Sequence, residues 1–326
     1  MSVYLDALAL LLDSAQTVRP VPPVDAGGRL VIGQATRYAP DDVRPFVLSL
    51  RRHTDAPCLL LVLREAKALH AFLAENAIDV LCVEDIDAPL EGSREFQRFG
   101  AFAWHLRRRA SLPETVLMVD VRDVIFQADP WPALAGRTAS FYPESDTAAL
   151  GAHVTSRWIA RTFGTPIAQV LAERKCVCAG TIAGRGDRIL ELLLIAITLA
   201  AIPRLSVARQ YGIDQAILNY IAHLGLVAGS EVRPNFREVA TLGLTPRERL
   251  SIADGDIVNP DGSISAIVHQ YDRFADLWQA VAARYEVNES AMTTRHSGQM
   301  SVPLAALGKR VRRLGFSLRK RIPEFR

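Results

Sequence analysis

Residues 115–123 have the sequence TVLMVDVRD, in which a mostly apolar run ends in two acids, Asp120 and Asp123. A short apolar run rich in β-branched residues is typical of a strand that is buried on both faces. Earlier runs of the same character predict three more strands, at residues 29–33, 58–63 and 79–83. The two acids therefore follow the fourth strand of a predicted sheet.

Amphipathic segments separate these strands. Residues 41–52, 66–76 and 94–109 carry apolar side chains at helical spacing and are predicted to be helices. Strands that alternate with helices indicate an α/β fold, in which helices flank a mostly parallel sheet on both faces. The second half is less regular, with expected strands at 139–142 and 265–268 and expected helices at 189–201 and 213–224.

The chain is predicted to have three parts. Residues 1–28 should form an N-terminal helix and a linker, which the sequence PVPP at 20–23 and the pair Gly27 and Gly28 mark. Residues 29–287 should form the main domain. Residues 288–326 begin as a flexible linker rich in Asn, Ser, Thr and Gly and end in a basic tail.

Several features bear on where the protein is found. Residues 4–13 are apolar but lack a basic start, so they do not resemble a secretory signal. Residues 192–202 form a shorter run than the roughly 20 residues of a membrane span and are predicted to be a buried helix. The four cysteines show no disulfide-like spacing, which favours a reducing compartment. Cys176 and Cys178 lack a matching zinc-type pair, so they are expected in the core. These features predict a cytoplasmic protein.

The charge is unevenly distributed along the chain. Residues 303–326 alone carry +7, from eight basic residues and one acid, whereas the net charge of the chain is +3, which leaves −4 for the rest. Apolar residues in this tail recur at helical spacing and predict a basic amphipathic helix, which would bind an anionic membrane surface. We therefore expect a peripheral protein on the inner face of the membrane.

The tail has an alternative interpretation, as an exposed charged segment or a nucleic-acid contact. However, its only aromatic residues are Phe316 and Phe325, so it lacks the interleaved stacking platforms that single-stranded nucleic acid requires. We expect no nucleic-acid partner.

The two acids after the fourth strand point to a cation. Carboxylates at the end of a buried strand are costly unless a positive charge neutralises them. Ligands collect at this edge of a parallel sheet, and Mg²⁺ or Mn²⁺ prefers oxygen ligands. An ion pair with Arg122 or a helix cap is the alternative explanation.

Residues 116–131, VLMVDVRDVIFQADPW, resemble the DxD region of GT-A fold glycosyltransferases, in the form D-x-R-D-V of bacterial members. The resemblance covers residues 29–280 and implies a GT-A-like, Rossmann-type sheet. Alignment on the downstream D-P-W favours Asp123 as a metal ligand. Asp120 would join it if a one-residue bulge shifts the end of the strand.

Other segments resemble the same family in the expected order. Thr36, Arg37 and Tyr38, in the loop after the first strand, resemble the segment that holds the nucleotide base and ribose. Arg98, in the helix before the acids, resembles a basic residue that faces the donor phosphates.

The later segments concern the transferred sugar and the metal. The sequence CVCAGTIAG at 176–184 resembles a strand and small-residue turn of the sugar pocket, which implies donor contacts for Gly180 and Thr181. Asp214 and Gln215 resemble the catalytic acid and amide that face the sugar, although Asp214 could simply cap its helix. His269 resembles a third metal ligand. The alternative interpretation is that His269 has only a structural role.

Together these likenesses imply a hexosyltransferase of polysaccharide biosynthesis that depends on Mn²⁺ or Mg²⁺. UDP-hexose is the implied donor, and a glycan or a lipid-linked sugar is the implied acceptor. Glu144 and Asp146 are candidate acceptor-side acids. The alternatives are a phosphatase of the haloacid dehalogenase type, or a non-catalytic scaffold with the GT-A fold. The four tryptophans are expected in the core: Trp104, Trp131, Trp158 and Trp278.

Overall fold

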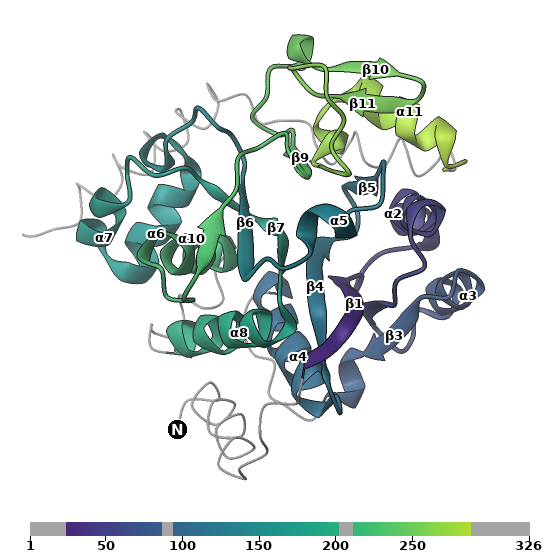
Figure 1. Ribbon diagram of the computed structural model, residues 1–326, viewed down its shortest axis with the longest axis horizontal. Coiled ribbons are helices and arrows are strands. Elements are labelled where there is room, and N and C mark those ends of the chain that lie inside the picture. The colour runs from purple at the N-terminus through teal and green to yellow at the C-terminus, as the bar shows by residue number, and fades with distance from the viewer. Residues whose placement is uncertain (1–23, 87–93, 202–210, 288–326) are drawn as a thin grey trace, which may run out of the picture. The chain divides into compact units, whose positions relative to one another are not determined.

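The computed structural model describes residues 24–86, 94–201 and 211–287. The expected N-terminal helix, the linker after residue 287 and the basic tail lie outside these residues. In the described part, seven strands form one sheet in the order β3-β2-β1-β4-β7-β6-β8 (Figure 1). The strands are β1 (Val24–Gln34), β2 (Cys58–Val62), β3 (Asp79–Cys82), β4 (Leu112–Asp120), β6 (Ala139–Pro143), β7 (Val177–Gly184) and β8 (Ser230–Val232).

The sheet is mixed and mainly parallel. Strands β3, β2, β1 and β4 are all parallel, as the alternation of strands and helices predicts. Strand β7 runs antiparallel to both β4 and β6, while β6 and β8 are parallel to each other. The predicted α/β fold is therefore confirmed, with one reversed strand in its middle.

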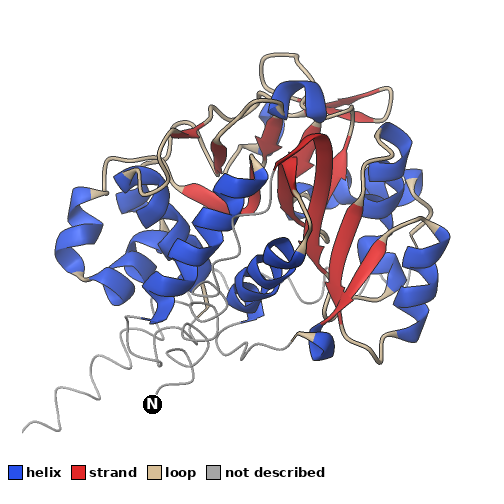
Figure 2. Cartoon of the chain, turned by 60° about the horizontal axis from the view of Figure 1, so that its bottom comes forward, coloured by secondary structure: helices blue, strands red, loops and turns tan. Residues whose placement is uncertain are grey.

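Helices pack on both faces of the sheet (Figure 2). Five of the described helices agree closely with the predicted segments, and four were not predicted, at residues 131–134, 154–163, 165–170 and 275–284. The helices are α2 (Pro40–His53), α3 (Lys67–Glu75), α4 (Arg94–Arg108), α5 (Trp131–Leu134), α6 (Val154–Phe163), α7 (Thr165–Val170), α8 (Gly186–Ala201), α10 (Ile213–Leu224) and α11 (Ala275–Arg284).

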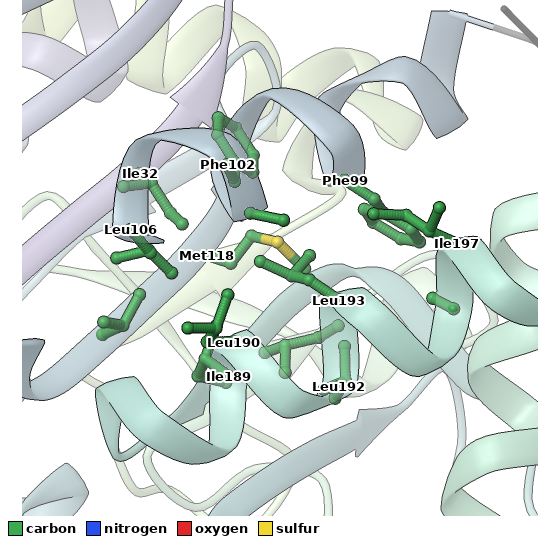
Figure 3. Packing of buried hydrophobic residues seen from close by; sticks show 14 of the residues in the cluster. Ile32, Phe99, Phe102, Leu106, Met118, Ile189, Leu190, Leu192, Leu193 and Ile197 are labelled. Carbon is green, nitrogen blue, oxygen red and sulfur yellow. The ribbon is translucent and has the colours of Figure 1, made fainter. Parts of the chain in front are cut away.

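Alternation along the strands divides the core between the two faces. Ile32 of β1 and Met118 of β4 face α4 and α8, where they meet side chains such as Phe99 and Leu193 (Figure 3). The intervening residues, such as Val31, pack on the other face against α2 and α3. This two-sided burial explains why the strands are apolar throughout rather than alternating with polar residues.

The predicted linker before the domain is wrong at its end. Strand β1 begins at Val24, so Gly27 and Gly28 lie within it. The pairing of β1 with β4 shifts between Asp25 and Arg29, and Gly27 has a φ of +88° at this bulge. Glycine adopts that conformation without a steric penalty. The two glycines thus mark a bulge rather than the start of the domain.

A small second sheet was not predicted. Strands β5 (Val124–Phe126), β12 (Ile267–His269) and β9 (Val239–Thr241) pair in the order β5-β12-β9. A separate hairpin joins β10 (Ser251–Ala253) and β11 (Asp256–Val258). Of these strands, β12 was expected at residues 265–268. The other three-residue strands are too short for hydrophobic periodicity to identify them.

The most apolar helix belongs to the core. Helix α8 contains the segment 192–201, and its residues Leu192, Leu193 and Ala196 are buried. Among the helices that the structure describes, none combines the length and apolar character that crossing a bilayer requires.

Candidate functional site

A cavity of about 520 Å³ opens where β1 and β4 end. This edge is where the parallel strands of an α/β sheet present ligand-binding residues, and the volume is in the range of small-molecule sites. The lining comes from segments distant in sequence, including the loop after β1, the end of β4, β7, the start of α10 and the end of β12. Most predicted site residues line it: Thr36, Arg37, Tyr38, Arg98, Asp120, Asp123, Gly180, Asp214, Gln215 and His269.

Asp120, Asp123 and His269 form one cluster. Nε2 of His269 lies 3.8 Å from Oδ2 of Asp120 and 3.7 Å from Oδ1 of Asp123. One ligand atom from each residue lies within 4.8 Å of the others. The predicted metal ligands are thus adjacent in the folded chain.

The small sheet brings these three residues together. His269 ends β12 and pairs with Val124, which follows Asp123 directly. The N–H of Gln270 also donates to the carbonyl of Asp123 at 2.8 Å. The bulge that the alignment requires near Asp120 is absent, because β1 and β4 stay in register up to Gln34 and Asp120. Instead, the short bend between β4 and β5 turns both carboxylates to the same place.

The donor set fits a divalent cation. In an octahedral site with bonds of about 2.1 Å, neighbouring ligand atoms lie roughly 3 Å apart and opposite ones about 4.2 Å. The two distances from His269, 3.7 and 3.8 Å, fall between these values, so a small movement of the side chains would complete such a site. Burial raises the pKa of Asp123, with Asp272 and Asp120 adding to the effect. A raised pKa means that ionising the buried carboxyl of Asp123 costs free energy. A bound cation would offset that cost, because it stabilises the ionised carboxylate. Cys178 Sγ lies 3.7 Å from Nδ1 of His269, on the side of the ring away from the acids.

Gly180 makes room for the cluster. A Cβ atom at this position would collide with the ring of His269 and lie 2.6 Å from Oδ2 of Asp120. The expected turn here is instead a bulged strand, because β6 pairs Phe141 with Ile182 but Pro143 with Val177. The bulged residues 178–180 line the cavity.

Thr181, for which a donor contact was predicted, does not line the cavity. The regular pairing of β7 with β4 includes Thr181, opposite Val119, and the side chain of Thr181 is fully enclosed. Its hydroxyl has no hydrogen-bond partner among the described residues.

Arg98 is a buried ion-pair partner inside the site. Its guanidinium forms salt bridges with Asp120 and with Asp214, the latter at 3.4 Å, and donates to the carbonyl of Ala179 at 3.1 Å. Although burial works against it, Arg98 lowers the pKa of Asp120. The guanidinium therefore holds two carboxylates, which differs from the predicted contact with donor phosphates.

Three other arginines line the cavity. Arg122 forms an ion pair with the buried Asp272 at 3.1 Å. Arg37 and Arg273 are both exposed at the rim. Sequence reasoning assigned no role to Arg273, although it lies in the same short segment as His269. Its closeness in sequence to His269 was the signal that could have identified Arg273 as a cavity residue.

Thr36 and Tyr38 lie on the β1 side of the cavity, as expected. The amide of Gln34 donates to Oγ1 of Thr36 at 3.1 Å. Burial raises the pKa of Tyr38 to about 12, so its phenol remains a hydrogen-bond donor at neutral pH.

Gln215 belongs to a second polar group, with Glu144. The Gln215 amide donates to Oε1 of Glu144 at 3.2 Å and to Oγ1 of Thr155 at 2.9 Å. His153 Nε2 contacts Oε2 of Glu144 at 2.9 Å, and its Nδ1 contacts Cys176 Sγ at 3.3 Å. The predicted acceptor-side acid Glu144 therefore lies in the cavity, whereas Asp146 is exposed and pairs with Lys175.

Glu144, His153 and Cys176 also have ligand atoms within 4.8 Å of one another. However, opposite nitrogens of His153 engage the carboxylate and the thiol, so the three form a hydrogen-bonded chain. Hydrogen bonds with Cys176 and Glu144 raise the pKa of His153 to about 10. The N–H of Thr155 points at Nδ1 at 3.2 Å, which only a neutral ring accepts. The contact of Nε2 with Glu144 is shorter, at 2.9 Å, and charge-assisted, and it favours the protonated ring.

Trp158 was expected in the core, but it lines the cavity. It packs edge-to-face against Tyr211, with ring centroids 5.6 Å apart. Trp131 and Trp278 are buried as expected. Apolar spacing on a helix does not distinguish a core tryptophan from one at a cavity, which is why the sequence pattern missed this position.

Comparison with models of known protein families finds no match, and neither does comparison with curated proteins. A functional proposal therefore depends on the fold and on the geometry of the cavity.

Proposed function

We propose that this chain is a metal-dependent glycosyltransferase of the GT-A type, which moves a sugar from a nucleotide-sugar donor to a glycan or lipid-linked acceptor. The observation that carries the proposal is the convergence of Asp120, Asp123 and His269 at the carboxyl edge of the sheet. Asp120 ends strand β4 and Asp123 follows it closely, whereas His269 comes from a segment near the end of the domain. This is the ligand set that the resemblance implies.

The three residues would hold Mn²⁺ or Mg²⁺, and such an ion stabilises the charge of a leaving diphosphate when bound. Arg37 and Arg273 would contact the phosphates from the rim, since both are exposed there. Thr36 and Tyr38 would hold the base and ribose. Arg98 would orient Asp214 toward the transferred sugar, because the two form a buried ion pair.

UDP-hexose is the donor that the resemblance favours, and a thermal-shift experiment tests it. A ligand at about 100 times its Kd that binds only the folded state adds roughly 2.7 kcal/mol to the free energy of unfolding. UDP with Mn²⁺ should therefore raise the Tm, and EDTA should remove the effect. Asp123→Asn is the matched control, because it removes a ligand charge at nearly constant volume. A shift with GDP or CMP but none with UDP would overturn the choice of nucleotide.

Turnover separates this proposal from its rivals. Sugar transfer requires the nucleotide sugar, whereas a phosphatase would release phosphate from a simple monoester such as para-nitrophenyl phosphate. Donor binding without turnover across a broad acceptor set would indicate a non-catalytic scaffold. Attachment to an anionic cytoplasmic membrane surface belongs to the same proposal and concerns the tail, which lies outside the described residues.

A further inference from the structure

One wall of the cavity combines an aromatic pair with a hydrogen-bonded acid. Trp158 comes from α6, and Tyr211 lies two residues before the start of α10. Their rings meet at an interplanar angle of 88°. The backbone of Gly212, with a φ of +85°, passes so close to Trp158 that a Cβ there would collide with the indole ring. The indole is therefore held in place by the main chain beside it.

Glu144 is joined to this wall through His153, the N-cap residue of α6, and is held on both oxygens. His153 contacts Oε2, and Gln215 donates to Oε1. Although burial works against it, the hydrogen bond with His153 lowers the pKa of Glu144, so the carboxylate is ionised at neutral pH. A carboxylate oxygen accepts more than one hydrogen bond, which leaves capacity for a ligand hydroxyl.

Strand β7 relates this wall to the metal-ligand cluster. Cys176, just before β7, contacts His153; Cys178 contacts His269; and Gly180 lies against Asp120. A strand rises about 3.3 Å per residue, so Cys176 and Gly180 are at most about 13 Å apart. The two polar groups thus flank a space that a sugar residue, with a diphosphate at one end, would fill.

We propose that the wall formed by Glu144, His153, Trp158 and Tyr211 is the acceptor subsite, which takes a carbohydrate and uses Glu144 as the base. The proposal deepens the proposed function and relies on it for the donor. Sugars present an apolar face of C–H groups and a rim of hydroxyls. Trp158 offers an aromatic surface for that face, and Glu144 offers an acceptor for a hydroxyl.

The reaction step balances with these residues. The acceptor hydroxyl gives its proton to Glu144 as its oxygen forms a bond to the anomeric carbon of the donor sugar. The bond between that carbon and the diphosphate oxygen breaks, and its electron pair leaves with the diphosphate. His153 and Gln215 are positioning residues, because they act through Glu144. Attack from this wall inverts the configuration of the anomeric carbon.

Binding of defined sugars tests the subsite. A panel of methyl glycosides and disaccharides of the common hexoses is titrated into protein saturated with UDP and Mn²⁺, and the Tm is followed. At least one sugar should raise the Tm further. Trp158→Ala and Tyr211→Ala should each lower the affinity for that sugar roughly tenfold. Trp158→Phe should retain most of the affinity. All three variants should keep the thermal shift that UDP and Mn²⁺ produce. The Tyr211 variant guards against misfolding, since Tyr211 is 72% exposed.

The possible outcomes separate the two proposals. If no sugar adds to the UDP–Mn²⁺ shift, or if Trp158→Ala keeps the full increment, the subsite is wrong and the donor site stands. If UDP with Mn²⁺ gives no shift, the proposed function fails, and the panel is titrated into the protein alone. If a sugar then raises the Tm of the wild-type protein but not of Trp158→Ala, the carbohydrate site is upheld. If no sugar does so, both proposals are overturned.

Turnover tests the base. Glu144→Gln should keep the UDP–Mn²⁺ shift but slow transfer at saturating acceptor sugar at least about 100-fold, the lower range for a general base. The product of wild-type transfer should show an inverted anomeric carbon by NMR. Wild-type turnover in Glu144→Gln, or a retained configuration, would overturn the role of Glu144.

Discussion

Nε2 of His269 lies 3.7 Å from Oδ1 of Asp123, and the backbones of the two segments are hydrogen-bonded next to this contact. The pairing of His269 with Val124 in the small sheet fixes this proximity. A side-chain contact set by a strand ladder is rigid, which suits a metal site because ligands have to be preorganised.

The first prediction concerns the metal ligands. Asp123→Asn and His269→Ala should each abolish the UDP–Mn²⁺ thermal shift and reduce transfer to background, because each removes one of three ligands. Circular dichroism should show a folded protein in both cases. A variant that keeps near-wild-type turnover at low Mn²⁺ would show that its residue is not a ligand.

The second prediction uses two positions of one strand. Gly180→Ala should weaken Mn²⁺ binding, because the added methyl group would displace His269 and Asp120. Thr181→Val is the matched control: its side chain is enclosed, and its hydroxyl has no partner among the described residues, so the change should leave metal binding intact. Isothermal titration with Mn²⁺ measures both. Equal affinities in the two variants would contradict the close approach at Gly180.

A third prediction separates two arginines. Arg98→Ala should lower the free energy of unfolding by about 3–5 kcal/mol, because two carboxylates lose a buried partner. Arg273→Ala should change it by no more than about 0.5 kcal/mol, since the side chain is exposed, yet weaken UDP binding. Urea unfolding and UDP titration measure the two effects. An unchanged UDP affinity in Arg273→Ala would remove this arginine from the phosphate site.

The fourth prediction is a pH dependence. The pKa of His153 rises from 6.5 to about 10 on folding, so its contribution to stability is complete below pH 6.5 and disappears as the pH approaches 10. The pKa of Glu144 falls below 4.5, so its contribution is complete above pH 4.5 and is lost in acid. His153→Asn retains a residue that can cap α6. Its Tm deficit should be largest between pH 4.5 and 6.5 and should shrink toward pH 10. A deficit that stays constant with pH would contradict an ion pair.

The fifth prediction concerns residues 303–326. A 1–302 truncation should lose sedimentation with anionic liposomes, whereas the full chain should bind at low salt and release at high salt, because the Debye length shortens from about 8 Å at physiological ionic strength. Activity on a water-soluble acceptor should be the same for both. Equal sedimentation of the two proteins would refute the membrane tether.

Local patterns were sufficient for the first half of the fold. The strands up to β4 and the helices between them were predicted within a few residues, because burial on two faces makes each strand continuously apolar. The same reasoning located Asp120 and Asp123 at the strand end. The reversed direction of β7 was not predictable, since a strand has the same periodicity whether it runs parallel or antiparallel.

The sequence by itself determined which residues are apolar, where the main strands and helices of the first half lie, and that acids stand at the end of the fourth strand, because these properties are visible over a few neighbouring residues. Only the tertiary structure decided that His269 meets Asp123, that Arg98 holds Asp120 and Asp214, and that Trp158 faces a cavity with Glu144. Each of these contacts joins segments far apart in the chain. Their proximity follows from strand pairing and packing, and local periodicity carries no information about which distant segment will lie opposite.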